Sequence, residues 1–165
     1  MEEQNSVGLQ QGIQTLRIIW AAMIGSLGIY LIIVHFIGKE IQFGEMPKAT
    51  YDMMRYALMG LGVVILFLAQ YVRKLILKGG LGTTTSNSIS PAHGSALGRY
   101  TAAVIISLAM SESVGIFGLL LFFLGRDFQT FYLFLAFSAI AMVVYRPKME
   151  ELESLSEPTG QEGNM

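Results

Sequence analysis

An acidic residue, Glu112, lies in the middle of a long apolar stretch, within the segment AMSESVGIFG at residues 109–118. The stretch runs from Tyr100 to Gly125, and Glu112 is its sole charged residue. In a helix, Glu112 would lie about twelve residues, or roughly 18 Å, from either end of the stretch. An acidic side chain at that depth of a bilayer costs on the order of 2.5–3.5 kcal/mol on insertion scales. A carboxyl group buried in this way favours its neutral form and releases its proton when water or a cation comes near. Glu112 is therefore the first candidate for ion or proton binding.

Small and polar residues surround Glu112 at helical spacing. A stripe of small residues on the same stretch would let another helix approach closely. The stripe consists of Ser107, Ser111, Gly115 and Gly118. Three hydroxyl groups close in sequence or at similar depth are candidate hydrogen-bond partners of Glu112, and they belong to Ser26, Ser111 and Ser138. The sequence thus predicts a carboxyl group that faces other helices rather than lipid.

A second interpretation gives Glu112 a structural role, as a neutral glutamic acid that fixes helix packing. Polar side chains do join membrane helices, with an average gain of about 0.6 kcal/mol per hydrogen bond. That gain is small against the cost of inserting an acid, so the sequence favours proton or cation exchange and leaves the structural role open.

The composition indicates that much of this protein is in contact with lipid. Charged residues make up 14% of the 165 residues and apolar residues 53%, whereas about 25% of an ordinary soluble domain is charged. The net charge of −1 gives no electrostatic reason to expect a nucleic-acid partner. The chain has no cysteine, which excludes disulfides and thiolate metal sites.

Four apolar stretches predict an all-α membrane protein with four transmembrane helices. The expected spans are residues 18–38, 56–72, 100–125 and 128–145, within a transmembrane domain at 17–146. At about 1.5 Å per residue, such lengths suit a hydrocarbon core about 30 Å thick. Only Arg126 and Asp127 separate the last two spans, so these form a tight hairpin in an antiparallel up-down bundle.

Lysine and arginine positions predict the orientation of this bundle. Seven of the 11 lie on the side of the two termini and four on the opposite side, and the excess favours both termini in the cytoplasm. We expect a multi-pass protein of the cell membrane, the cytoplasmic (inner) membrane in a bacterium. Three segments are expected outside the bilayer: an N-terminal segment at 1–16, a flexible Gly/Ser/Thr-rich loop at 79–98 and an unstructured acidic tail at 147–165.

No set of residues indicates an enzyme or a cofactor site. His35 lies near one end of the first span and His93 in the loop, so the two do not offer a pair of haem ligands on facing helices. The segment GGLGTTT at 79–85 lacks the lysine of a phosphate-binding loop. We expect no catalytic residue, no cofactor and no metal site.

The segment SESVGIFGLLLFFLG at 111–125 resembles the carboxylate-bearing helix of the proteolipid, or c, subunit of rotary ATP synthases and ATPases. In that family a membrane-embedded acid is followed by small and aliphatic residues, an aromatic–glycine pair and an aliphatic run. Glu112, Gly115, Ile116, Phe117 and Gly118 match this order. The resemblance covers about fifteen residues, and it implies reversible binding of a proton or sodium ion at Glu112 within a ring of repeated hairpins.

Two classes of function follow from the sequence. In the first, the chain is a proteolipid-like subunit whose carboxyl group at the bilayer midplane binds or exchanges a proton or cation. In the second, it is a non-catalytic accessory or assembly subunit of a larger membrane complex, and Glu112 is structural. In both, the expected partners are the lipid bilayer and either further copies of the chain or other subunits of a membrane complex.

Overall fold

Five helices form the computed structural model, which describes residues 2–36, 38, 47–78 and 93–156. In chain order they are α1 (Glu2–Phe36), α2 (Lys48–Leu77), α3 (His93–Gly125), α4 (Phe128–Val144) and α5 (Met149–Ser156). The described residues contain no strand. The predicted all-helical fold is therefore confirmed.

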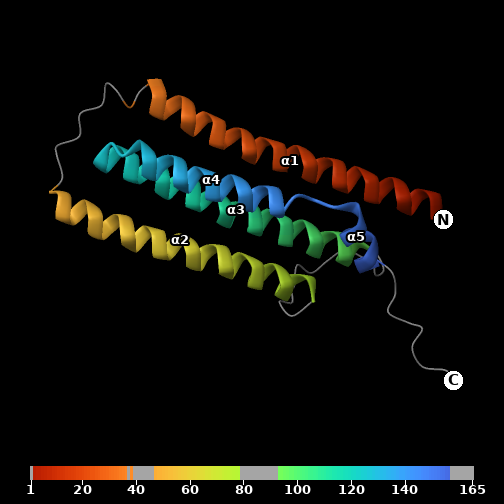
Figure 1. The fold of residues 1–165 in the computed structure, drawn as a ribbon. Helices are drawn as coiled ribbons and strands as arrows, with labels where there is room; N and C mark the ends of the chain where they lie inside the picture. Colours follow the sequence, from red (N-terminus) through yellow and green to blue (C-terminus); the bar gives the residue numbers. More distant parts are fainter. Residues whose placement is uncertain (1, 37, 39–46, 79–92, 157–165) are drawn as a thin grey trace.

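The hairpin of α3 and α4 lies at the centre of the bundle, with α1 on one side and α2 on the other (Figure 1). The start of α1 and the short α5 lie at one end, called here the terminal end. The connection between α3 and α4 lies at the opposite end, called the hairpin end. Because α3 packs against each of the other four helices, it fixes the position of Glu112 within the bundle.

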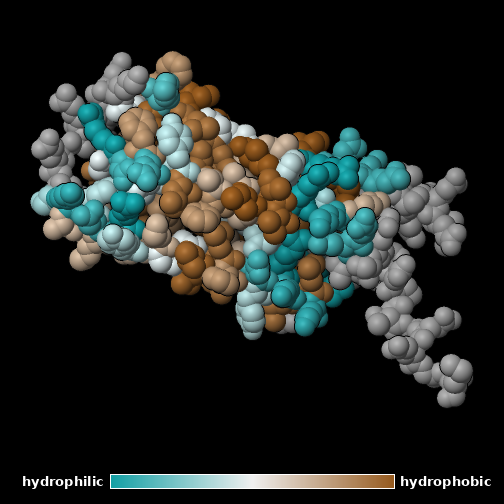
Figure 2. Space-filling model, viewed as in Figure 1, coloured by the Kyte–Doolittle hydropathy of each residue, from teal (hydrophilic) through white to brown (hydrophobic). Residues whose placement is uncertain are grey.

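Three helical segments are long and apolar enough to cross a membrane, namely Gln10–Phe36, Lys48–Leu77 and Leu97–Gly125. The shorter α4 is also apolar and has 17 residues. Large apolar side chains cover much of the outer surface, and Phe67, for example, is 73% exposed. Figure 2 shows these side chains as a broad hydrophobic zone between more hydrophilic ends. Such a surface suits contact with lipid, as expected of a small integral membrane protein.

The helices extend beyond the apolar stretches seen in the sequence. α1 already begins at Glu2, within the segment at 1–16. Of the loop expected at 79–98, residues 79–92 lie outside the described residues, and 93–98 form the first turns of α3 rather than a flexible linker. Hydropathy marks only the part of a helix that suits lipid, whereas helical hydrogen bonds continue into polar segments.

The acidic tail at 147–165 contains a helix that the sequence analysis did not predict. α5 covers Met149–Ser156, and residues 157–165 lie outside the described residues. Leu152 is fully buried and Met149 packs against the same core. This apolar contact with the bundle explains why a short, mostly polar segment is helical, since an isolated helix of this length is not stable in water.

Small residues of α3 allow the close packing of α3 against α4. A Cβ atom added at Gly118 would lie 2.6 Å from the Cβ of Phe134. One added at Gly115 would lie 3.2 Å from Oγ of Ser138 and 3.0 Å from Leu27 of α1. The predicted stripe is therefore a close-packed surface, and α4 is the main helix that it contacts.

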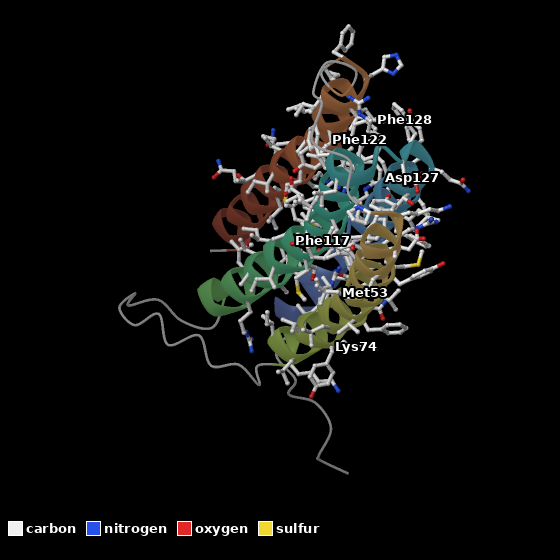
Figure 3. All side chains as sticks on the ribbon, turned by 90° about the vertical axis from the view of Figure 1, so that its left-hand side faces the viewer. Met53, Lys74, Phe117, Phe122, Asp127 and Phe128 are labelled. Carbon is white, nitrogen blue, oxygen red and sulfur yellow. The ribbon has the colours of Figure 1, made fainter. Side chains whose placement is uncertain are left out.

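At the hairpin end, Asp127 joins α2 to the start of α4. Its side chain caps α4 by accepting hydrogen bonds from the backbone N–H of Thr130 at 3.1 Å and from its hydroxyl at 2.5 Å. Tyr51 of α2 donates a hydrogen bond to the same carboxyl group at 3.4 Å, and Arg55 forms an ion pair with it at 3.7 Å. Figure 3 shows Asp127 at the opposite end of the bundle from Lys74.

The pKa of Asp127 reflects these contacts. Burial raises the pKa of this carboxyl group, but the hydrogen bonds from Thr130 and the positive charge of Arg55 act in the opposite direction. Together with the backbone N–H of Gln129 they outweigh burial and hold the pKa of Asp127 below its ordinary value.

At the terminal end, polar contacts fasten α5 to the bundle. The hydroxyl of Tyr100 donates to the backbone carbonyl of Lys148 at 2.9 Å and accepts from its N–H at 2.8 Å. Arg73 of α2 forms an ion pair with Glu151, and its guanidinium carbon lies 5.5 Å from the ring centre of Tyr145. The end of α2, the end of α4 and α5 are thus joined through the side chain of Arg73.

We predict that Gly118→Ala lowers the free energy of unfolding by about 1–3 kcal/mol, because the added methyl group overpacks the contact with Phe134. The measurement is the thermal midpoint in detergent micelles. Gly28→Ala is the matched control, since a Cβ atom at Gly28 would meet no heavy atom within 4 Å. Equal effects of the two substitutions would contradict the close α3–α4 contact.

The second prediction concerns pH and Asp127. Its folded pKa lies below the unfolded value of about 3.9, so ionisation stabilises the fold above that pH, and the gain is lost as the pH falls through the folded pKa. Asp127→Asn should therefore be less stable than the wild type at neutral pH, and the difference should shrink below about pH 4. Thermal midpoints across this range test it, with Asp52→Asn as a control. A difference that does not change with pH would refute the electrostatic explanation.

Candidate functional site

Glu112 is half-buried on α3, and its carboxyl group faces α1. The hydroxyl of Ser26 donates a hydrogen bond to Oε1 at 2.6 Å, and the hydroxyl of Tyr30 donates to the same oxygen at 2.9 Å. Ser26 and Tyr30 are four residues apart in the sequence, so they lie on one face of α1. The site thus consists of two hydroxyl groups from one helix and one carboxyl group from another.

The hydroxyl of Ser26 has two oxygen neighbours, because it also lies 2.6 Å from the backbone carbonyl of Met23. A hydroxyl group has one proton to donate and lone pairs with which to accept. When Glu112 is ionised, Ser26 donates to the carboxylate. When Glu112 is neutral, Ser26 can donate to Met23 and accept the acid proton, since both distances suit O–H···O hydrogen bonds. The same side-chain positions therefore accommodate either protonation state.

Two of the predicted partners of Glu112 have other roles. The hydroxyl of Ser138 donates to the backbone carbonyl of Ser111 at 2.7 Å, across the contact between α4 and α3. Ser111 itself donates to the carbonyl of Ser107 at 2.8 Å, one turn earlier in its own helix. The three serines are buried. Each of their hydroxyl groups donates to a backbone carbonyl of α3, on a different face of α3 from the carboxyl group of Glu112. Of the predicted partners, only Ser26 contacts Glu112.

Tyr30 is the partner of Glu112 that the sequence analysis did not identify. Tyrosines near the ends of apolar stretches are expected at the membrane interface, so residue type alone does not single out Tyr30. The feature of the sequence that indicates Tyr30 is its spacing of four residues from Ser26, because this spacing places both hydroxyl groups on one helix face. A tyrosine one turn from a predicted polar partner is better assigned to the interior.

The position of α1 depends strongly on these polar contacts. Only 11% of the most apolar part of α1 is buried within the bundle, compared with 44% for α3. Besides the two bonds to Glu112, the indole N–H of Trp20 donates to the backbone carbonyl of Met142 at 2.8 Å. Glu112 and Met142 therefore anchor a helix that otherwise has a small apolar contact area.

The site offers oxygen atoms alone. Within the described part of the chain, no group of three or more His, Cys, Asp or Glu side chains comes together as a metal site would require. Oxygen atoms of a carboxyl group, two hydroxyls and a backbone carbonyl are suited to a proton or to a hard cation rather than to a transition metal.

Comparisons of the chain with protein-family profiles, with curated proteins and with solved structures give no match. The contacts of Glu112 and the helices that hold them are therefore the basis for inferring a function.

We predict that Ser26→Ala and Tyr30→Phe each lower the free energy of unfolding by about 0.5–1.5 kcal/mol. Because both hydroxyl groups bind Oε1 of Glu112, the loss in the double variant should differ from the sum of the single losses. Thermal midpoints in detergent measure these effects. Ser113→Ala is the matched control, since this hydroxyl bonds to the carbonyl of Ala109 in its own helix. Strict additivity would argue against a shared site.

Proposed function

We propose that this chain is a small four-span membrane protein in which Glu112 binds and releases a proton or a cation. α4 would be the fourth span. Its 17 residues correspond to about 25 Å of helix, slightly less than a hydrocarbon core of about 30 Å. Asp127 and Arg146, which flank this helix, would lie near the two interfaces. The distribution of lysine and arginine supports a cytoplasmic location for both termini.

The observation that carries the proposal is the convergence of two hydroxyl groups of α1 on one oxygen of a half-buried carboxyl group on the apolar helix α3. Both donors act on Oε1, so the proton of the neutral acid can lie on Oε2, or on Oε1 where Ser26 accepts it. Loss of that proton would create a charge that Ser26 and Tyr30 already point toward. Such preformed donors reduce the rearrangement that ionisation requires.

The role would be that of a subunit rather than of an independent channel. Few polar side chains accompany Glu112 along α3, so the chain by itself offers little to line a hydrated path. A proton could then reach Glu112 only where another subunit supplies water or charge. This is the arrangement implied by the resemblance of residues 111–125 to the proteolipid subunit, with further copies of the chain or other subunits as partners. We assign no catalytic step and no cofactor to the chain.

A second function is favoured by a specific observation, since both donors to Glu112 belong to α1. In this alternative Glu112 is a permanently neutral link that holds α1 on α3, and the chain is an accessory or assembly subunit of a larger membrane complex. The two functions differ in one property, namely whether the proton of Glu112 exchanges.

The titration of Glu112 in a lipid bilayer tests the proposal. Infrared difference spectra between about pH 4 and about pH 10 follow the carboxyl stretch of the neutral acid. Glu112→Gln is the control, because the amide keeps the oxygen acceptor and cannot ionise. We expect a reversible loss of the carboxyl band in the wild type that is absent in the control, and a change in this transition when sodium is added if a cation competes.

A carboxyl band that persists across the whole range would overturn the proposal. If Glu112→Gln were also as stable as the wild type and assembled normally, Glu112 would be a structural link and the accessory role would replace proton exchange. The infrared signal thus distinguishes the two functions without knowledge of the larger complex.

A further inference from the structure

An apolar groove of about 310 Å³ lies between α2 and α4. Both helices pack against α3 and leave this space between them. On α2 the groove runs from Met59 to Gln70, and on α4 from Leu133 to Tyr145. The eleven helical rises from Met59 to Gln70 correspond to about 16 Å, or roughly half the thickness of the hydrocarbon core. The groove is therefore long, narrow and largely within the depth of the lipid chains.

The ends of the groove differ in polarity. Its lining is apolar from Met59 onward and becomes polar at Gln70 and Tyr145, toward the terminal end. Lys74 lies one turn beyond Gln70 and is exposed. The lining residues Val63, Phe67 and Gln70 follow one another at spacings of four and three, and Lys74 comes four residues later. Lys74 therefore lies on the side of α2 that faces the groove. Figure 3 shows Lys74 near the end of α2.

Charges near this end favour an anion. Arg73 is paired with Glu151, and its guanidinium group lies over the ring of Tyr145, a lining residue. That pair is neutral overall, and Lys74 adds a positive charge beside an uncharged amide donor, Gln70. A positively charged side chain next to an amide N–H at the level of the lipid head groups suits a phosphate group.

The groove has room for only part of a helix. A helix about 10 Å across and 16 Å long occupies on the order of 1,300 Å³, well above the 310 Å³ of the groove. A single extended hydrocarbon chain is narrow and flexible enough to fill such a space and to add apolar contacts between α2 and α4.

We propose that the groove binds one anionic phospholipid, with an acyl chain between α2 and α4 and its phosphate beside Lys74 and Gln70. The lipid would fill the space between two helices that pack on α3 more than on each other and would join their ends at the head-group level. This proposal depends on the membrane location of the chain and not on the protonation of Glu112.

Native mass spectrometry of the purified protein tests the proposal, with phosphatidylglycerol and phosphatidylcholine added in parallel. We expect one retained phosphatidylglycerol per chain and weaker retention of phosphatidylcholine. Val63→Phe should abolish retention, because Val63 lines the groove. The neighbouring Val64→Phe is the matched control, because Val64 is exposed at 59% and does not line the groove.

A second pair of variants tests the phosphate contact without altering the groove. Lys74→Gln should reduce the preference for phosphatidylglycerol over phosphatidylcholine by about fivefold, whereas Lys48→Gln at the hairpin end should not change it. Equal retention in the two valine variants, no preference between the lipids, or a dimer that excludes lipid would each overturn the proposal. Glu112→Gln should retain the lipid, so failure of the proton-exchange function would leave this result unaffected.

Discussion

The close contact between α3 and α4 at Gly118 is the constraint on which the rest of the bundle depends. With no side chain at this position, the hairpin brings Phe134 onto the backbone of α3. The connection is short, and its residue Arg126 has a φ of 53°, in the left-handed region that few non-glycine residues adopt. The hairpin contact and the capping of α4 by Asp127 stabilise this turn. α1 and α2 then pack on the sides of an already compact pair.

The two outer helices are attached to this pair in different ways. α2 packs on α3 along a row of buried residues that repeats about every seven positions, Gly62, Ala69 and Ile76. α1 has a smaller buried share and relies on hydrogen bonds to Glu112 and to the carbonyl of Met142. The protonation of Glu112 and the attachment of α1 are therefore physically linked. A change in the protonation of Glu112 would alter the same hydrogen bonds that hold α1, whereas a permanently neutral Glu112 would keep that attachment fixed.

Polar contacts stabilise the two ends of the bundle, and apolar contacts stabilise the part between them. Asp127 joins α2 to the start of α4, and Arg73 and Tyr100 join α2, α3 and the segment that leads into α5. Between these ends, α2 and α4 touch α3 more than each other, and the groove follows from this geometry. Two helices fastened at both ends around a third leave a gap that lipid is well suited to fill.

The sequence by itself determined the helical architecture, the position of Glu112 within an apolar helix and the identity of Ser26 as one of its partners, because hydropathy and helical spacing are local properties of the chain. It also identified the small residues of α3 that allow close packing. Only the tertiary structure decided which helix packs on each face of α3. It assigned Ser111 and Ser138 to the α4 contact, brought Tyr30 to Glu112, buried Leu152 of α5 and opened the groove beside α2. These features depend on the rotation of each helix relative to its neighbours, and that rotation is fixed by contacts between residues far apart in the sequence.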